Sequence, residues 1–231
     1  SLVRFATGLD LPAASSPTGA EIKFSGISFW GHSQGATEGG IALPYATGVI
    51  GTVLSGEGAG LIDALLGKKS PVDIADALPF VLEEPSIGAY HPVLSILQNA
   101  LDVADPLNHA RALASSPIVV GNAKHVFQPY GIGDTYAPPA SEAAFALAAG
   151  LGLVLAPAST TSDSIGGLVG VPAPATGNLT DNAKPITAFV REYAASGYDG
   201  HFVAYKNSVA KADVAHFLAD SLNGKVPQIG R

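Results

Sequence analysis

Cysteine and methionine are both absent from the 231 residues of this chain, and charged side chains are scarce. Without cysteine, the chain can form neither a disulfide framework nor a thiolate metal site. Charged residues make up 13% of the sequence, about half the share in an average globular protein. This low charge is typical of a protein with much buried sheet and a sizeable apolar surface or cleft.

Long apolar runs and positive charge are also lacking. The longest run of apolar residues and glycine, from Ala143 to Ala156, is too short to span a bilayer. The net charge of -7 argues against a nucleic-acid partner. We therefore expect a soluble protein with no transmembrane segment. Its abundance of Ala, Gly, Pro, Ser and Thr resembles secreted bacterial enzymes, so we expect a secreted or periplasmic location.

The most informative motif is the pentapeptide Gly31-His32-Ser33-Gln34-Gly35, which matches G-x-S-x-G. A strand-like segment, 22–29, precedes it, and a run of small residues follows. In a nucleophile elbow, a serine occupies a tight turn from strand to helix, and small neighbours let the two backbones approach. The sequence therefore predicts Ser33 as a nucleophile; the alternative is an ordinary Gly/Ser turn.

The remaining pattern predicts a single α/β domain over residues 1–231. Proline positions indicate several short helices within 61–116, and the C-terminal helix places Val209 and Leu222 on its apolar side. The expected elements are a surface connection over 1–20, strands over 22–29, 47–56, 117–120, 125–131 and 185–193, helices over 34–46, 140–149 and 208–223, and loop with one short strand over 151–184.

Two further residues follow expected strands in a suggestive order. Asp134 lies in a Gly-Asp loop after one strand, and His201 lies beside Gly200 in a loop after the last. The order Ser33, Asp134, His201 resembles the α/β-hydrolase superfamily, in particular its esterase and lipase branches. His201 would act as general base and acid, Asp134 would orient it, and the backbone N–H of Gln34 would supply half of an oxyanion hole.

Other acidic residues compete with Asp134 for the role of acid. Glu57 follows the second strand, a position that some hydrolases of this superfamily use. Asp199 lies close to His201 in sequence and is expected to form a turn, and Asp163 lies in an uninformative loop. Five other histidines are expected to be packing or solvated residues without zinc-site spacing: His32, His91, His109, His125 and His216.

The helical insertion over 61–116 resembles the lid of many members of this superfamily. Its apolar residues would line an acyl pocket, or alternatively pack between helices and sheet. Trp30 and Tyr136 lie near the catalytic turns and are expected to contact substrate, although Trp30 could equally belong to the core. The resemblance thus implies hydrolysis of apolar or lipid-like esters through an acyl-enzyme, without metal or organic cofactor.

The resemblance also implies a missing part, because the elbow of this superfamily follows the fifth strand of an eight-stranded sheet. Only one strand fits before Gly31. We therefore expect the chain to be the C-terminal part of a hydrolase, with an N-terminal fragment of the same hydrolase completing the sheet and the oxyanion hole. The alternatives are a rearranged minimal hydrolase, a non-catalytic binding module of this fold, and an enzyme that uses Ser1 as its nucleophile.

Overall fold

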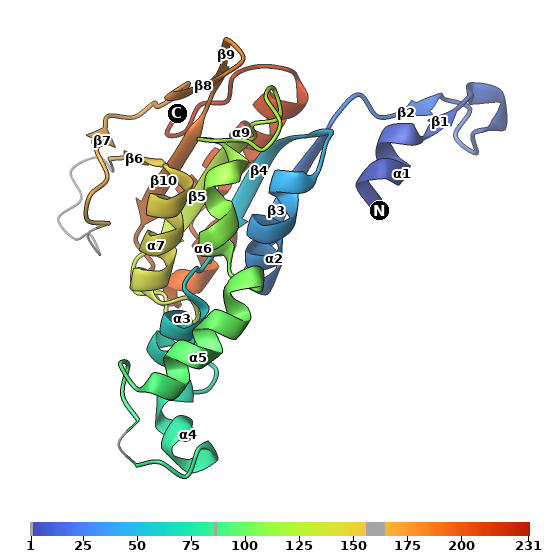
Figure 1. Ribbon diagram of the computed structural model, residues 1–231. Helices are drawn as coiled ribbons and strands as arrows, with labels where there is room; N and C mark the ends of the chain where they lie inside the picture. The colour runs from blue at the N-terminus through green and yellow to red at the C-terminus, as the bar shows by residue number, and fades with distance from the viewer. Residues whose placement is uncertain (1, 86, 156–164) are drawn as a thin grey trace.

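A computed structural model describes residues 2–85, 87–155 and 165–231. Its centre is a parallel six-stranded sheet with the strand order β3-β4-β5-β10-β6-β7 (Figure 1). The expectation of an α/β fold is therefore confirmed. The strands are β3 (Ile27–His32), β4 (Val49–Ser55), β5 (His125–Gly131), β10 (Ala188–Tyr193), β6 (Gly152–Val154) and β7 (Gly170–Val171).

Helices cover both faces of this sheet, and alternate residues of each central strand supply the two cores. On β5, Val126 and Tyr130 belong to one core, whereas Phe127 belongs to the other and packs on Phe217. Burial of a phenylalanine such as Phe217 contributes roughly 1.5–3 kcal/mol. The first core includes residues of α2 (Gln34–Ala42) and α7 (Pro139–Ala149), against which α6 (Pro106–His109) packs. The second core includes residues of α8 (Val203–Lys206) and α9 (Ser208–Leu222).

The segment 61–116 is helical and divided as its prolines predict, with one exception. Pro92 and Pro106 begin α5 (Pro92–Leu101) and α6, whereas Pro79 lies inside α4 (Ile74–Val81). Three helices, α3 (Leu61–Gly67), α4 and α5, project from one end of the molecule, whereas α6 packs against α2 and α7 (Figure 1). Short 3-10 turns at Asp102–Ala104 and Ala110–Leu113 complete the segment.

The N-terminal region differs from the expectation in two ways. Residues 1–20 are not a plain surface connection, because α1 (Leu2–Gly8) packs Val3 against the core. The strand expected over 22–29 is broken. Its first part, β2 (Ile22–Lys23), pairs antiparallel with β1 (Asp10–Leu11), and β3 begins only at Ile27. A 3-10 turn at Ala13–Ser15 lies between β1 and β2.

Three further expectations need correction. The apolar residues at 117–120 form no strand and are largely exposed, because Asp181 accepts hydrogen bonds from the N–H groups of Gly121 and Ala123 and holds a turn there. Within 151–184, β6, β7 and β8 (Leu179–Asp181) replace the single short strand expected. The last strand is divided at Thr187 into β9 (Lys184–Ile186) and β10.

The helix after Ser33 is also shorter than expected, since α2 ends at Ala42 and a 3-10 turn at Leu43–Tyr45 contains Pro44. The C-terminal helix α9 is present, but Val209 and Leu222 are about half exposed rather than on its buried side. Among the described residues, no helix has both the length and the apolar character needed to cross a membrane.

Candidate active site

Ser33 occupies a strained turn between β3 and α2. Its backbone has φ 55° and ψ -126°, a conformation that side-chain-bearing residues rarely adopt. The turn is tight because Gly31 leaves no room for a side chain: a Cβ there would lie 2.5 Å from the Gly35 carbonyl oxygen. The Ser33 N–H donates to the Ser55 carbonyl at 2.8 Å, which fixes the turn against β4. This is the backbone geometry of a nucleophile elbow.

Asp134 and His201 lie together at the same edge of the sheet as Ser33, because parallel strands bring their carboxyl ends to one side. The His201 Nδ1 lies 2.7 Å from Asp134 Oδ2, and both side chains are buried. The other oxygen, Oδ1, accepts hydrogen bonds from the N–H groups of Tyr136 and Ala137 at 2.7 and 2.8 Å. The carboxylate is therefore fixed in place before it meets the imidazole.

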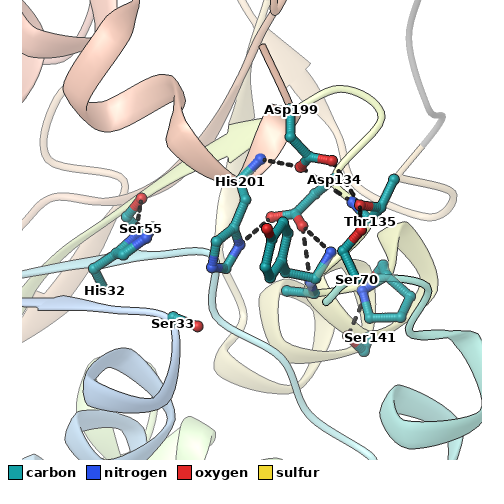
Figure 2. A network of polar contacts seen from close by, with 12 residues as sticks. His32, Ser33, Ser55, Ser70, Asp134, Thr135, Ser141, Asp199 and His201 are labelled. Carbon is teal, nitrogen blue, oxygen red and sulfur yellow. Dashed lines mark hydrogen bonds and ion pairs between the residues drawn. The ribbon is translucent and has the colours of Figure 1, made fainter. Parts of the chain in front are cut away.

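Ser33 lies on the side of the His201 ring opposite Asp134 (Figure 2). In the part of the chain that the structure describes, no hydrogen bond joins the Ser33 hydroxyl to this ring. When Nδ1–H donates to Asp134, the neutral ring leaves Nε2 as a free acceptor on its other side. Contacts of this kind are often long without substrate and shorten when it binds.

The loops that carry Asp134 and His201 are closely packed against each other. A Cβ on Gly131 would lie 1.9 Å from the Gly200 carbonyl oxygen, so only glycine allows this approach. Asp199 joins the two loops: its carboxylate accepts from the His201 N–H at 2.9 Å and from the Thr135 hydroxyl at 2.6 Å (Figure 2). Burial opposes its charge, but these hydrogen bonds hold its pKa below the ordinary value of 3.8. Asp199 is thus more than the turn former expected.

Aromatic rings surround His201 and restrict its orientation. Tyr136 stacks on it with ring centroids 4.7 Å apart, and Phe202 meets it edge-on at 5.3 Å. His32 lies on a further side at 4.5 Å, with its own Nδ1 3.3 Å from the Ser55 hydroxyl. Burial and the neighbouring His201 lower the pKa of His32 to about 4. At neutral pH, His32 is therefore a neutral packing residue and does not repel a protonated His201.

A cavity of about 290 Å³ opens beside Ser33 and is lined by α2, α3, the loop after β4 and the Asp134 loop. Of the two residues predicted to contact substrate, Tyr136 lines this cavity and Trp30 does not. Trp30 instead stacks on Tyr205 at 5.3 Å and lines a separate groove beside α9. The Gln34 N–H lies in the first turn of α2, where backbone donors have no intrahelical acceptor.

Glu57, the competing acid, is fully buried, and neither carboxyl oxygen has a hydrogen-bond partner among the described residues. Burial, reinforced by the negative charge of Asp105, raises its pKa well above 4.5. Glu142 on α7 is buried in the same way, and burial together with Asp134 raises its pKa. For both groups, burial therefore favours the neutral, protonated form of the carboxyl group. The sequence gives no sign of Glu142, which lies in an Ala-rich helix.

The other candidate residues lie apart from this site. His125 is buried on β5, where its Nδ1 accepts from the Thr187 N–H and burial lowers its pKa to about 4. His91 caps α5, His109 contacts Tyr45, and His216 lies on an exposed part of α9. Ser1 and Asp163 lie outside the described residues. Within those residues, no group of three or more His, Cys, Asp or Glu side chains could hold a metal ion.

No protein-family model matches the chain, and no curated protein matches it. The chemistry of the site has to follow from its geometry.

Proposed function

We propose that this chain is the catalytic part of a serine carboxylic-ester hydrolase. The observation that carries this proposal is the arrangement at one sheet edge: Ser33 in a strained turn, with the paired Asp134 and His201 beside it. A strained serine next to an oriented imidazole is an arrangement that activates a hydroxyl for attack on a carbonyl carbon. A serine held at positive φ costs conformational energy, and such strain is concentrated at functional sites.

The proposed reaction has two halves, acylation and deacylation, and each half uses two proton transfers through His201. The Ser33 oxygen attacks the ester carbonyl while His201 Nε2 takes the hydroxyl proton, and the carbonyl oxygen becomes an oxyanion that accepts from the Gln34 N–H. The tetrahedral intermediate then expels the alcohol, which receives the proton from His201, and leaves an acyl-Ser33. Water repeats the sequence and releases the carboxylic acid. Asp134 stabilises the charged form of His201 throughout.

The cavity beside Ser33 supports small or lipid-like esters as substrates. Apolar side chains of α3, including Leu61 and Leu65, line one wall of this cavity. With α4 and α5, α3 belongs to the projecting layer of helices, which exposes large apolar residues such as Phe80 and Ile96. We propose that this layer acts as a lid over the acyl group.

The edge of the sheet at β3 supports an N-terminal part of the same hydrolase as partner. Among the described residues, β3 pairs with β4 on one side and with no strand on the other. Beside this edge, Trp30, Leu218 and Leu222 line an apolar groove of about 580 Å³. An unpaired strand edge next to apolar surface is a site for a further strand and its covering helix. Such a segment would also supply the second oxyanion donor.

The first test is labelling of the natural full-length protein with a fluorophosphonate, which reacts with activated serines. We expect one adduct by intact-mass spectrometry, no adduct in Ser33→Ala, and a rate in Asp134→Asn lower by a factor on the order of 10³ to 10⁴. Glu57→Gln is the matched control, because Glu57 makes no contact with His201, and it is expected to react at the wild-type rate. A second polypeptide in the same spectrum would identify the N-terminal partner.

The opposite results would favour the alternatives. A folded protein that gives no adduct, and hydrolyses no 4-nitrophenyl ester, would be a binding module of this fold. An adduct that persists in Ser33→Ala would place the nucleophile elsewhere. Equal loss of labelling in Asp134→Asn and Glu57→Gln would contradict the assignment of Asp134, rather than Glu57, as the acid that orients His201.

A further inference from the structure

One charged side chain lines the cavity beside Ser33 within the described part of the chain, and it is Lys68. The other lining groups are apolar or uncharged, among them Leu65, Tyr136 and Ser141. An ammonium group in a cavity of mixed polar and apolar lining attracts an anion more strongly than one in open solvent does, because fewer waters screen it. The cavity that Ser33 lines is therefore also lined by a positively charged residue.

Lys68 has no counter-charge of its own. No carboxylate of the described residues lies within ion-pair distance of its ammonium group, whereas the next residue, Lys69, pairs with Asp73 at 2.7 Å. Lys68 is also half-buried, while Lys69 is exposed. Of two adjacent lysines, the one that lines the cavity is thus the one without an ion pair among the described residues.

The backbone around Lys68 is anchored to the Asp134 loop. The Lys68 N–H donates to Ala64 at the end of α3, and the N–H groups of Lys69 and Ser70 both donate to the Thr135 carbonyl, at 2.8 and 3.0 Å. Thr135 directly follows Asp134 and is itself held by Asp199. The backbone of Lys68 is therefore held in place relative to the site before any ligand binds, so that only its side chain needs ordering on binding.

We infer that Lys68 is a specificity-determining residue, which selects esters carrying a carboxylate or phosphate a few bonds from the scissile carbonyl. This inference rests on the proposed function and narrows it, from apolar esters in general to esters with an anionic group. The apolar wall from α3 accommodates the hydrocarbon part, and Lys68 binds the anion at its end. A contact between an ammonium and an anion that is partly shielded from water is worth about a factor of ten in binding.

Two matched pairs of substrates test this, with the anion on the acyl side or on the alcohol side. The first pair is the 4-nitrophenyl monoester of glutarate against 4-nitrophenyl pentanoate, which have acyl chains of equal length. The second is butanoylglycerol 3-phosphate against butanoylglycerol. The quantity measured is the ratio of kcat/KM for the anionic to the neutral member, in the full-length protein and its variants.

We expect Lys68→Met to lower this ratio about tenfold in at least one pair, and Lys68→Glu to lower it further. The pair that responds identifies the side of the ester that carries the anion. Lys69→Met is the matched control and is expected to leave the ratio unchanged, since its ammonium is paired outside the cavity. The wild-type preference is also expected to fall as salt concentration rises.

Three results would overturn the inference, and they are distinguishable. If the protein hydrolyses the neutral esters and neither ratio changes in Lys68→Met and Lys68→Glu, the cavity has no anion selectivity through Lys68, and the proposed function stands alone. If Ser33-dependent hydrolysis of every ester is absent in a folded protein, the proposed function fails and the inference fails with it. An equal change in Lys69→Met would reduce the effect to general surface charge.

Discussion

At the scale of single residues, Gly31 and Gly35 lie two positions before and two positions after Ser33, but the space around them differs. A Cβ on Gly31 would lie 2.5 Å from the Gly35 carbonyl oxygen and 2.8 Å from Ala36 Cα, both of which are backbone atoms that cannot move aside. A Cβ on Gly35 would meet nothing within 4 Å, and Gly35 lies in α2. The close approach of strand and helix is therefore concentrated on the first glycine.

The two substitutions to alanine should have opposite effects. Gly31→Ala forces β3 and α2 apart, so we expect a loss of more than about 2 kcal/mol in the free energy of unfolding and little ester hydrolysis. Gly35→Ala should raise the free energy of unfolding by about 0.5–1 kcal/mol, because alanine is the better helix former. Denaturant unfolding of both variants checks this. Equal destabilisation by the two would contradict the asymmetry.

Some residues of the candidate site could be predicted from the sequence, and others could not. Ser33, Asp134 and His201 could be predicted because a motif, a loop position and a chain order point to them, and the structure places them at one sheet edge. Their catalytic roles remain predictions. Glu142 could not be predicted, because its burial depends on how α7 packs against β5. Trp30 is expected near the site because it is close to Ser33 in sequence, but it lies further from the carboxyl end of β3 and stacks on Tyr205 beside α9.

At the scale of elements, the Asp134 loop and the His201 turn are joined by Asp199. One carboxylate oxygen accepts from the N–H groups of Thr135 and His201, and the other accepts from the Thr135 hydroxyl. An asparagine keeps an acceptor for the two N–H groups, whereas an alanine leaves them unpaired. We expect Asp199→Ala to lower kcat about ten- to hundredfold with a smaller change in KM. Asp199→Asn should retain most of the wild-type kcat.

The pH profile distinguishes positioning from a general loss of stability. If Asp199 aligns His201 with Asp134, the apparent pKa of the rate profile should change in Asp199→Ala and return in Asp199→Asn. A variant that is merely less stable would lose amplitude at every pH without a change in profile. Wild-type kinetics in Asp199→Ala would show that Gly131 and Gly200 alone hold the loops together.

The helices and strands could be predicted where the apolar residues of the sequence are also the buried ones. Apolar residues are a reliable guide to burial for β4 and β5, which are buried on both faces and consist largely of apolar residues. They fail for α9, whose buried side includes Asp213, paired with Arg191 and Tyr193. A buried ion pair breaks the apolar pattern that a helix normally presents. They fail again at 117–120, where apolar residues remain exposed because a turn is held by Asp181.

At the scale of the whole molecule, three buried groups and the half-buried His32 have shifted pKa values that act on stability in opposite directions. His32 and His125 have pKa values of about 4, below the ordinary 6.5, so the unfolded chain binds their protons first as the pH falls. Their contribution to stability is complete above pH 6.5 and is lost below it. Glu57 and Glu142 have pKa values well above 4.5, so the folded chain keeps their protons longer. Their contribution is complete below pH 4.5 and is lost as the pH rises.

The sum of these effects predicts the pH dependence of stability. Between pH 4.5 and 6.5 the two histidines and the two glutamates act in opposite directions, so their effects on the free energy of unfolding offset each other for as long as the glutamates stay protonated. Above pH 6.5 the histidines no longer contribute, and stability should fall by about 1.4 kcal/mol per pH unit for each glutamate that stays protonated. Urea unfolding from pH 5 to 8 measures this, and Glu57→Gln together with Glu142→Gln should abolish the fall, because an amide cannot ionise. Wild-type stability that stays constant or rises above pH 6.5 would mean that water or rearrangement relieves the buried carboxyl groups.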